Sequence, residues 1–162
     1  MAWRRSQLLG ALAVVVGVAA LVALVFEPWY LNYDSRYALL WARDLIDGFT
    51  PEFEAPFAPT PHPGWNALAV PMLVFGEGAD DALAWLVLLS FGGVVWLVYA
   101  LGAELFNRWV GVVAALVVLT RAAMLRDVVL AYLDLPFAAL MLLAVLLEVR
   151  APRRGAATLA VP

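Results

Sequence analysis

Residues 8–26 read LLGALAVVVGVAALVALVF, an uncharged apolar run of 19 residues. As a helix rising 1.5 Å per residue, this run would be about 28 Å long, close to the ~30 Å hydrocarbon core of a bilayer. Arg4 and Arg5 precede it. A cleaved signal peptide would have an apolar core of only ~7–15 residues and small residues at its cleavage site, where this chain reads EPW. We therefore expect a retained membrane-spanning helix.

The composition of the whole chain also indicates a membrane protein. Of its 162 residues, 65% are hydrophobic and 14% are charged, and the mean hydropathy is +0.91. Soluble domains are closer to ~45–50% apolar and ~25% charged, and a chain this short cannot bury so much apolar surface inside itself. The net charge of -3 argues against a nucleic-acid partner. These residues include no cysteine for a disulfide or a cysteine metal site.

Three further apolar runs lie at residues 82–103, 109–125 and 135–149. Together with the first run they predict an all-α fold, a single transmembrane domain with about four spans. Arginines precede the first run and follow the fourth, and positive residues stay cytoplasmic, so we expect a cytoplasmic amino terminus. All ten basic residues are arginine, and alanine is abundant, which suggests a GC-rich bacterial genome and an inner (plasma) membrane location.

Residues 27–81 form a long loop expected on the outer face, because they contain nine acidic residues and only two basic ones. Apolar residues spaced by three and four predict a surface helix at 34–47, which Gly48 would end. A proline-rich extended stretch follows it. The apolar run at 64–75 is too short to span, so we expect a second interfacial or re-entrant helix there.

Two acidic residues of the outer side are candidates for chemistry. Asp34 lies just beyond the first span, and Asp134 lies at the membrane edge before the fourth. An ionisable group at that depth is costly and suggests function. The alternative for each is structural, because an aspartate can cap the helix that begins beside it.

Four further residues are candidates for binding substrate. His62, the single histidine, lies among prolines, and a lone histidine is weak support for a metal site. Arg121 and Arg126 are placed to hold an anionic group at the outer interface, or to extend toward lipid headgroups instead. Arg36 follows Asp34 closely. We expect no metal site made of protein side chains alone.

Several short motifs occur in a recognisable order. They are Asp34-Ser-Arg-Tyr-Ala38 with Gly48 and Pro51, then His62-Pro63, then Tyr99-Ala-Leu-Gly-Ala-Glu-Leu-Phe106, then Leu133-Asp-Leu-Pro-Phe137. In these motifs, over most of residues 8–150, the chain resembles the amino-terminal part of GT-C membrane glycosyltransferases. The branch it resembles most contains protein O-mannosyltransferases and lipid A aminoarabinose transferases.

The resemblance implies transfer of a sugar from a polyprenyl-phosphate donor to a protein or lipid acceptor on the outer face. It implies that Asp34 is the catalytic residue, and that Asp134 matches an acid that recurs early in the fourth helix. From their common outer-face location we expect Asp34 to be the base, Asp134 to assist it or share a divalent cation, and Arg121 or Arg126 to contact the donor phosphate. His62 and Arg36 are expected as further substrate contacts. The chain departs from the family at Ser35, where many members have a second acid, and after His62-Pro63, where many have another proline.

Two other functions are consistent with the sequence. A small four-span membrane protein could serve as a non-catalytic partner or scaffold, although the 55-residue outer loop is long for that role. A transporter segment is disfavoured, because the apolar runs contain almost no internal charge for an ion path. Residues 155–162 resemble the opening of a fifth span, so we expect a fragment of a longer enzyme that would be inactive alone.

Overall fold

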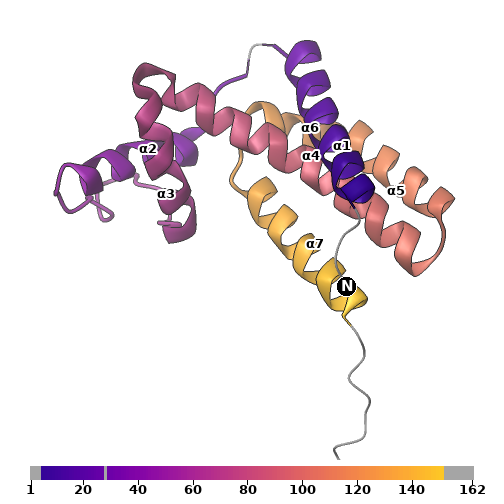
Figure 1. Ribbon diagram of the computed structural model, residues 1–162. Helices are drawn as coiled ribbons and strands as arrows, with labels where there is room; N and C mark the ends of the chain where they lie inside the picture. Colours follow the sequence, from indigo (N-terminus) through magenta and orange to yellow (C-terminus); the bar gives the residue numbers. More distant parts are fainter. Residues whose placement is uncertain (1–4, 28, 152–162) are drawn as a thin grey trace, which may run out of the picture.

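A computed structural model describes residues 5–27 and 29–151 (Figure 1). These residues form helices, turns and loops, with no β-strand among them. The helices are α1 (Arg5–Val25), α2 (Tyr33–Ile46), α3 (Pro63–Ala69), the 3₁₀ helix η1 (Val70–Gly78), α4 (Ala79–Leu105), α5 (Arg108–Thr120), α6 (Ala122–Val129) and α7 (Asp134–Arg150). The all-α prediction is confirmed.

The long helix α4 is the centre of the fold. Helices α1, α5 and α7 pack along it, whereas α2, α3 and η1 gather near its first residues as a separate lobe (Figure 1). We call these two parts the bundle and the outer lobe. The main apolar core runs through both parts, and its largest fully buried side chains include Phe91, Leu83 and Leu88 of α4.

Glycines allow the bundle helices to approach one another closely. A Cβ added to Gly92 of α4 would lie 2.9 Å from the Cα of Val15 in α1, so the two backbones touch there. Gly102 of α4 meets Gly111 of α5 in the same way, with only 2.7 Å between an added Cβ and the Gly111 Cα. Such small-residue contacts are the usual way for helices to associate in lipid, where apolar burial gives little driving force.

Helix length and composition indicate a membrane protein. Among the described residues, two helical stretches are long and apolar enough to cross a bilayer, namely α1 and the stretch 63–105 that ends in α4. A third would result if α6 and α7, which are bent by 118° to each other, formed one span. Helix α5 has 13 residues and is therefore only about 20 Å long. By length and composition the described residues therefore contain two or three candidate spans, and the predicted four are not confirmed.

The predicted third span at 109–125 is wrong as a single helix. Helix α5 ends at Thr120, Arg121 adopts an extended conformation with φ -73° and ψ 113°, and α6 starts in a new direction. The Thr120 hydroxyl donates to the Leu116 carbonyl in the preceding turn, at 2.7 Å. Such back-bonding competes with the helical pattern and bends helices, which favours an end at this point.

The predicted helix at 64–75 is also divided. Its first part is α3, and the second is the 3₁₀ helix η1, which leads directly into α4. Pro71 lacks an N–H, and its ring obstructs the carbonyl of Ala67, so an α-helix cannot continue through it without distortion. Gly76 has φ 58°, a conformation that glycine adopts easily, and it turns the chain into α4.

Helix α2 lies close to its predicted position, and its two ends explain why. The side chain of Asn32, and not that of Asp34, caps the start by accepting from the Ser35 N–H at 2.8 Å. At the other end Gly48 has φ 80°, its N–H bonds the Leu45 carbonyl, and the Phe49 N–H bonds the Asp44 carbonyl. This pair of bonds is a Schellman motif, as the placement of Gly48 predicts.

The contact between α1 and α4 can be tested with two neighbouring glycines. We expect Gly92→Ala to lower the free energy of unfolding by about 1–3 kcal/mol, because the new methyl group must displace backbone atoms of α1. Gly93→Ala is the matched control, since its Cβ would meet the Ala139 Cβ at an ordinary 3.9 Å. Both changes gain the same helix propensity. The difference is measured by unfolding each variant with increasing amounts of a denaturing detergent. Equal free energies of unfolding for the two variants would contradict the close contact.

Candidate functional site

The start of α2 is fastened to the turn between α6 and α7. The Tyr30 N–H donates to the Val129 carbonyl at 3.0 Å, and the Asn32 N–H donates to the Leu130 carbonyl at 2.9 Å. Two segments about one hundred residues apart therefore run side by side at the junction of the outer lobe and the bundle. We call this contact the outer junction.

A buried side-chain hydrogen bond completes the outer junction. The Ser35 hydroxyl, which is fully buried, donates to the Ala131 carbonyl at 2.6 Å. Ala131 itself is buried and has φ 49°, a left-handed conformation that is costly for a residue other than glycine. This turn directs the Ala131 carbonyl away from α6 and toward α2, where Ser35 supplies the partner it needs.

Both predicted catalytic acids lie beside the outer junction in the sequence, and only Asp134 lines one of the described cavities. Asp34 immediately precedes Ser35 and lies half-buried in the first turn of α2. Asp134 lies three residues after Ala131 and is the first residue of α7, where it is exposed. Neither carboxylate accepts a capping hydrogen bond or pairs with a cation within the described part of the chain. The N-cap alternative for Asp34 is wrong, because Asn32 has that role.

A cavity brings His62 and Asp134 together, although 72 residues separate them in the sequence. Its volume is about 450 Å³, and it opens between the start of α3 and the start of α7. Its other walls are mainly apolar: Pro63, Gly64, Trp65 and Leu68 on one side, and Leu133, Pro136, Phe137 and Leu140 on the other. Largely apolar cavities with a few polar groups are typical of binding sites for small molecules.

The arginines lie apart from this cavity. Arg126 lines a different cavity of about 350 Å³, together with Phe26 and Tyr30 at the end of α1. It pairs with Asp127 at 2.9 Å, and both side chains reach solvent, so the pair adds little stability. Arg121 is exposed at the break between α5 and α6, and Arg36 is exposed on α2. The structure therefore groups Asp134 with His62, and does not group either of them with an arginine.

No three histidine, aspartate or glutamate side chains within residues 5–27 and 29–151 are close enough together to hold a metal ion. Magnesium is commonly held by one or two carboxylates together with substrate phosphates. Asp134 could take part in such a shared site with a phosphate-bearing substrate.

A row of aromatic rings on α2 was missed in the sequence analysis. Tyr33, Tyr37 and Trp41 contact one another in succession in tilted and edge-to-face arrangements, with ring centroids 4.9 and 5.3 Å apart, and Phe53 of the following loop packs on Trp41 at 5.0 Å. The Tyr33 hydroxyl donates to the Phe57 carbonyl. A hydrogen bond with the Tyr37 side chain is the main cause that raises the pKa of Tyr33. The spacing of four residues between these tyrosines and the tryptophan was the available signal.

Comparisons of the chain with protein-family models, with curated proteins and with solved structures found no match.

The outer junction can be tested at Ser35. We expect Ser35→Ala to lower the free energy of unfolding by about 1–3 kcal/mol, because the buried Ala131 carbonyl loses its partner. Ser90→Ala is the matched control, since the Ser90 hydroxyl bonds only the Leu86 carbonyl of its own helix. That carbonyl keeps its place in α4. A loss of stability in both variants alike would mean that the outer junction has no special role.

Proposed function

We propose that this chain forms the amino-terminal part of a membrane glycosyltransferase. The enzyme would move a sugar from a polyprenyl-phosphate donor to a protein or lipid acceptor on the outer face of the plasma membrane. The observation that supports this most directly is the outer junction, because the Ser35–Ala131 hydrogen bond holds the segments of Asp34 and Asp134 together. The two motifs that contain these acids are about one hundred residues apart in the sequence and adjacent in the fold.

Asp34 would act as the general base. It lies in the first turn of α2 with no capping bond or cation partner among the described residues, so its oxygens are available to an acceptor hydroxyl or amine. In a displacement with inversion, the base removes the acceptor proton while the acceptor attacks the sugar carbon from the side opposite the leaving phosphate. The sugar–phosphate bond breaks, and the phosphate leaves with its electron pair.

Asp134 and His62 would bind the substrate in the cavity between α3 and α7. A carboxylate and an imidazole offer the donors and acceptors that sugar hydroxyls require, beside mainly apolar walls. Arg126 or Arg121 would meet the phosphate of the donor from the other side of the junction. That role requires Arg126 to exchange Asp127 for the phosphate.

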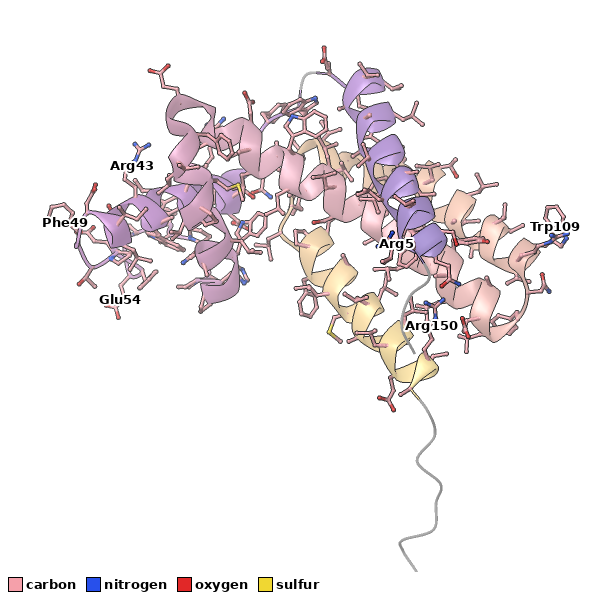
Figure 2. All side chains as sticks on the ribbon, viewed as in Figure 1. Arg5, Arg43, Phe49, Glu54, Trp109 and Arg150 are labelled. Carbon is pink, nitrogen blue, oxygen red and sulfur yellow. The ribbon has the colours of Figure 1, made fainter. Side chains whose placement is uncertain are left out.

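We further propose four membrane crossings, with the amino terminus in the cytoplasm. At one end of the bundle the segment after α1 bonds the end of α6. At the opposite end Arg150, which ends α7, bonds Glu104 near the end of α4 at 3.1 Å. The chain would therefore cross the same thickness in α1, in α4, in α5 with α6, and in α7. Figure 2 shows Arg5 and Arg150 well apart from Phe49 and Glu54, in the half of the molecule that contains Trp109, in line with the positive-inside rule.

A non-catalytic partner protein is the second candidate. The lateral faces of α5 and α7 expose large apolar side chains, such as Val113, Val117, Leu140 and Leu147, which could pack against helices of another subunit. The two functions differ in one respect that can be measured, because a scaffold has no transfer activity for a carboxylate substitution to remove.

The catalytic assignment is tested in the complete protein with a lipid-phosphate sugar and an acceptor. We expect Asp34→Asn to reduce the transfer rate by about 10²–10⁴-fold, the usual contribution of a general base. Asp47→Asn is the control, because it removes an exposed charge at the other end of α2. Both variants should reach wild-type levels in the membrane. A rate for Asp34→Asn within about threefold of the control would exclude Asp34 as the base.

The proposed topology is tested by labelling single cysteines, since the chain contains none of its own. We expect Phe49→Cys and Glu54→Cys to react with a membrane-impermeant maleimide in intact cells. Trp109→Cys, at the far end of the bundle, should react only after permeabilisation (Figure 2). The reverse pattern would mean that the orientation is opposite to the proposed one. Labelling of all three variants in intact cells would refute a membrane crossing between the outer lobe and Trp109.

A further inference from the structure

A further cavity lies away from the outer junction, within the bundle. Its volume is about 640 Å³, and α1 and α5, which both pack on α4, form its two sides. Most of its lining is apolar or small, including Gly10, Ala11 and Val14 of α1, Val95 and Ala100 of α4, and Leu116 of α5. The cavity is open to the outside of the bundle along the lipid-exposed flanks of α1 and α5, where Val14 and Leu116 are exposed.

One end of the cavity is polar. Gln7, Glu104 and Arg150 line it there, at the first turns of α1 and the last turns of α4 and α7. The Arg150 Nε donates to the Glu104 Oε2 at 3.1 Å. The two side chains are 24% and 41% exposed, so an anionic and a cationic group are both presented at the rim. Because these residues lie at helix ends, the topology proposed above would place the rim at the level of a membrane surface rather than at its centre.

We propose that this cavity binds one molecule of phosphatidylethanolamine, with an acyl chain between α1 and α5 and the headgroup at the rim. An acyl chain matches the part of the lining away from the rim, most of which is apolar or small. The headgroup has a phosphate and a protonated primary amine, which complement Arg150 and Glu104 respectively. The inference concerns the bundle and does not depend on the function proposed for the outer junction.

The rim selects this headgroup over two common alternatives. Phosphatidylglycerol has the phosphate but no cation, so it leaves Glu104 facing a net negative lipid. Phosphatidylcholine has a cation without N–H donors, so it cannot donate a hydrogen bond to a carboxylate. A protein helix bound in the same cavity would exclude lipid altogether. The absence of retained lipid therefore distinguishes a protein occupant from a lipid.

Two glycines of α1 provide a matched test of the acyl-chain site. An added Cβ at either Gly10 or Gly17 would meet nothing within 4 Å, but only Gly10 lines the cavity. Gly10→Phe should therefore fill the cavity without disturbing the helix contacts, and Gly17→Phe should place the same ring in open space. The third variant, Glu104→Gln, keeps the shape of the rim and removes its negative charge.

The full protein and the three variants are equilibrated in detergent with equal amounts of phosphatidylethanolamine, phosphatidylglycerol and phosphatidylcholine, and the retained lipid is counted by native mass spectrometry. We expect wild type and Gly17→Phe to retain one phosphatidylethanolamine, and Gly10→Phe to retain about tenfold less, equivalent to ~1.4 kcal/mol. Glu104→Gln should still retain lipid, with the preference for phosphatidylethanolamine over phosphatidylcholine reduced about two- to fivefold.

Three results would overturn the proposal. Wild type that retains no lipid would mean that another occupant, such as a protein helix, belongs in the cavity. Equal retention by Gly10→Phe and Gly17→Phe would place the lipid elsewhere on the bundle. A preference for phosphatidylglycerol, or one unchanged in Glu104→Gln, would refute the recognition of the headgroup by the rim.

Discussion

The hydrogen bond from the Ser35 hydroxyl to the Ala131 carbonyl connects the two halves of the molecule. It joins residues 96 positions apart, and both are buried. The carbonyl is available because Ala131 leaves the α6 geometry with a positive φ. In a low-dielectric environment an unpaired carbonyl is expensive, so this bond and the neighbouring Tyr30 and Asn32 backbone bonds favour one position of the outer lobe on the bundle. The relative position of Asp34 and Asp134 depends on it.

The bundle and the outer lobe are each stabilised by a different kind of interaction. In the bundle, α4 meets α1 and α5 at Gly92, Gly102 and Gly111, where backbone approaches backbone and dispersion replaces the hydrophobic effect. In the outer lobe, α2 is amphipathic, carries capping bonds at both ends and buries Trp41 beneath other aromatic rings. Apolar burial and capping bonds together hold that lobe in place. The outer junction lies where these two environments meet.

Local signals in the sequence predicted the elements that local interactions determine. Helix α2 has a regular apolar period and a glycine at its end, and its bounds were predicted within one residue. The break at Arg121 was missed because apolar periodicity reports neither the extended backbone of Arg121 nor the Thr120 hydrogen bond that favours a helix end there. The outer junction, and the cavity that His62 and Asp134 both line, could not be predicted. Both bring together residues 72 or more positions apart, which are close only in the folded chain.

The positions of the two acids also constrain where a phosphate could bind. Asp34 and Asp134 both lie in the first turn of a helix, where the helix dipole favours negative charge. A carboxylate can accept a proton, but it repels a phosphate close to it. A lipid-phosphate donor would therefore present its sugar to the acids and keep its phosphate toward arginine. Arg126 lines the cavity beside the end of α1, so the donor would have to lie across the outer junction, with its two ends in different cavities.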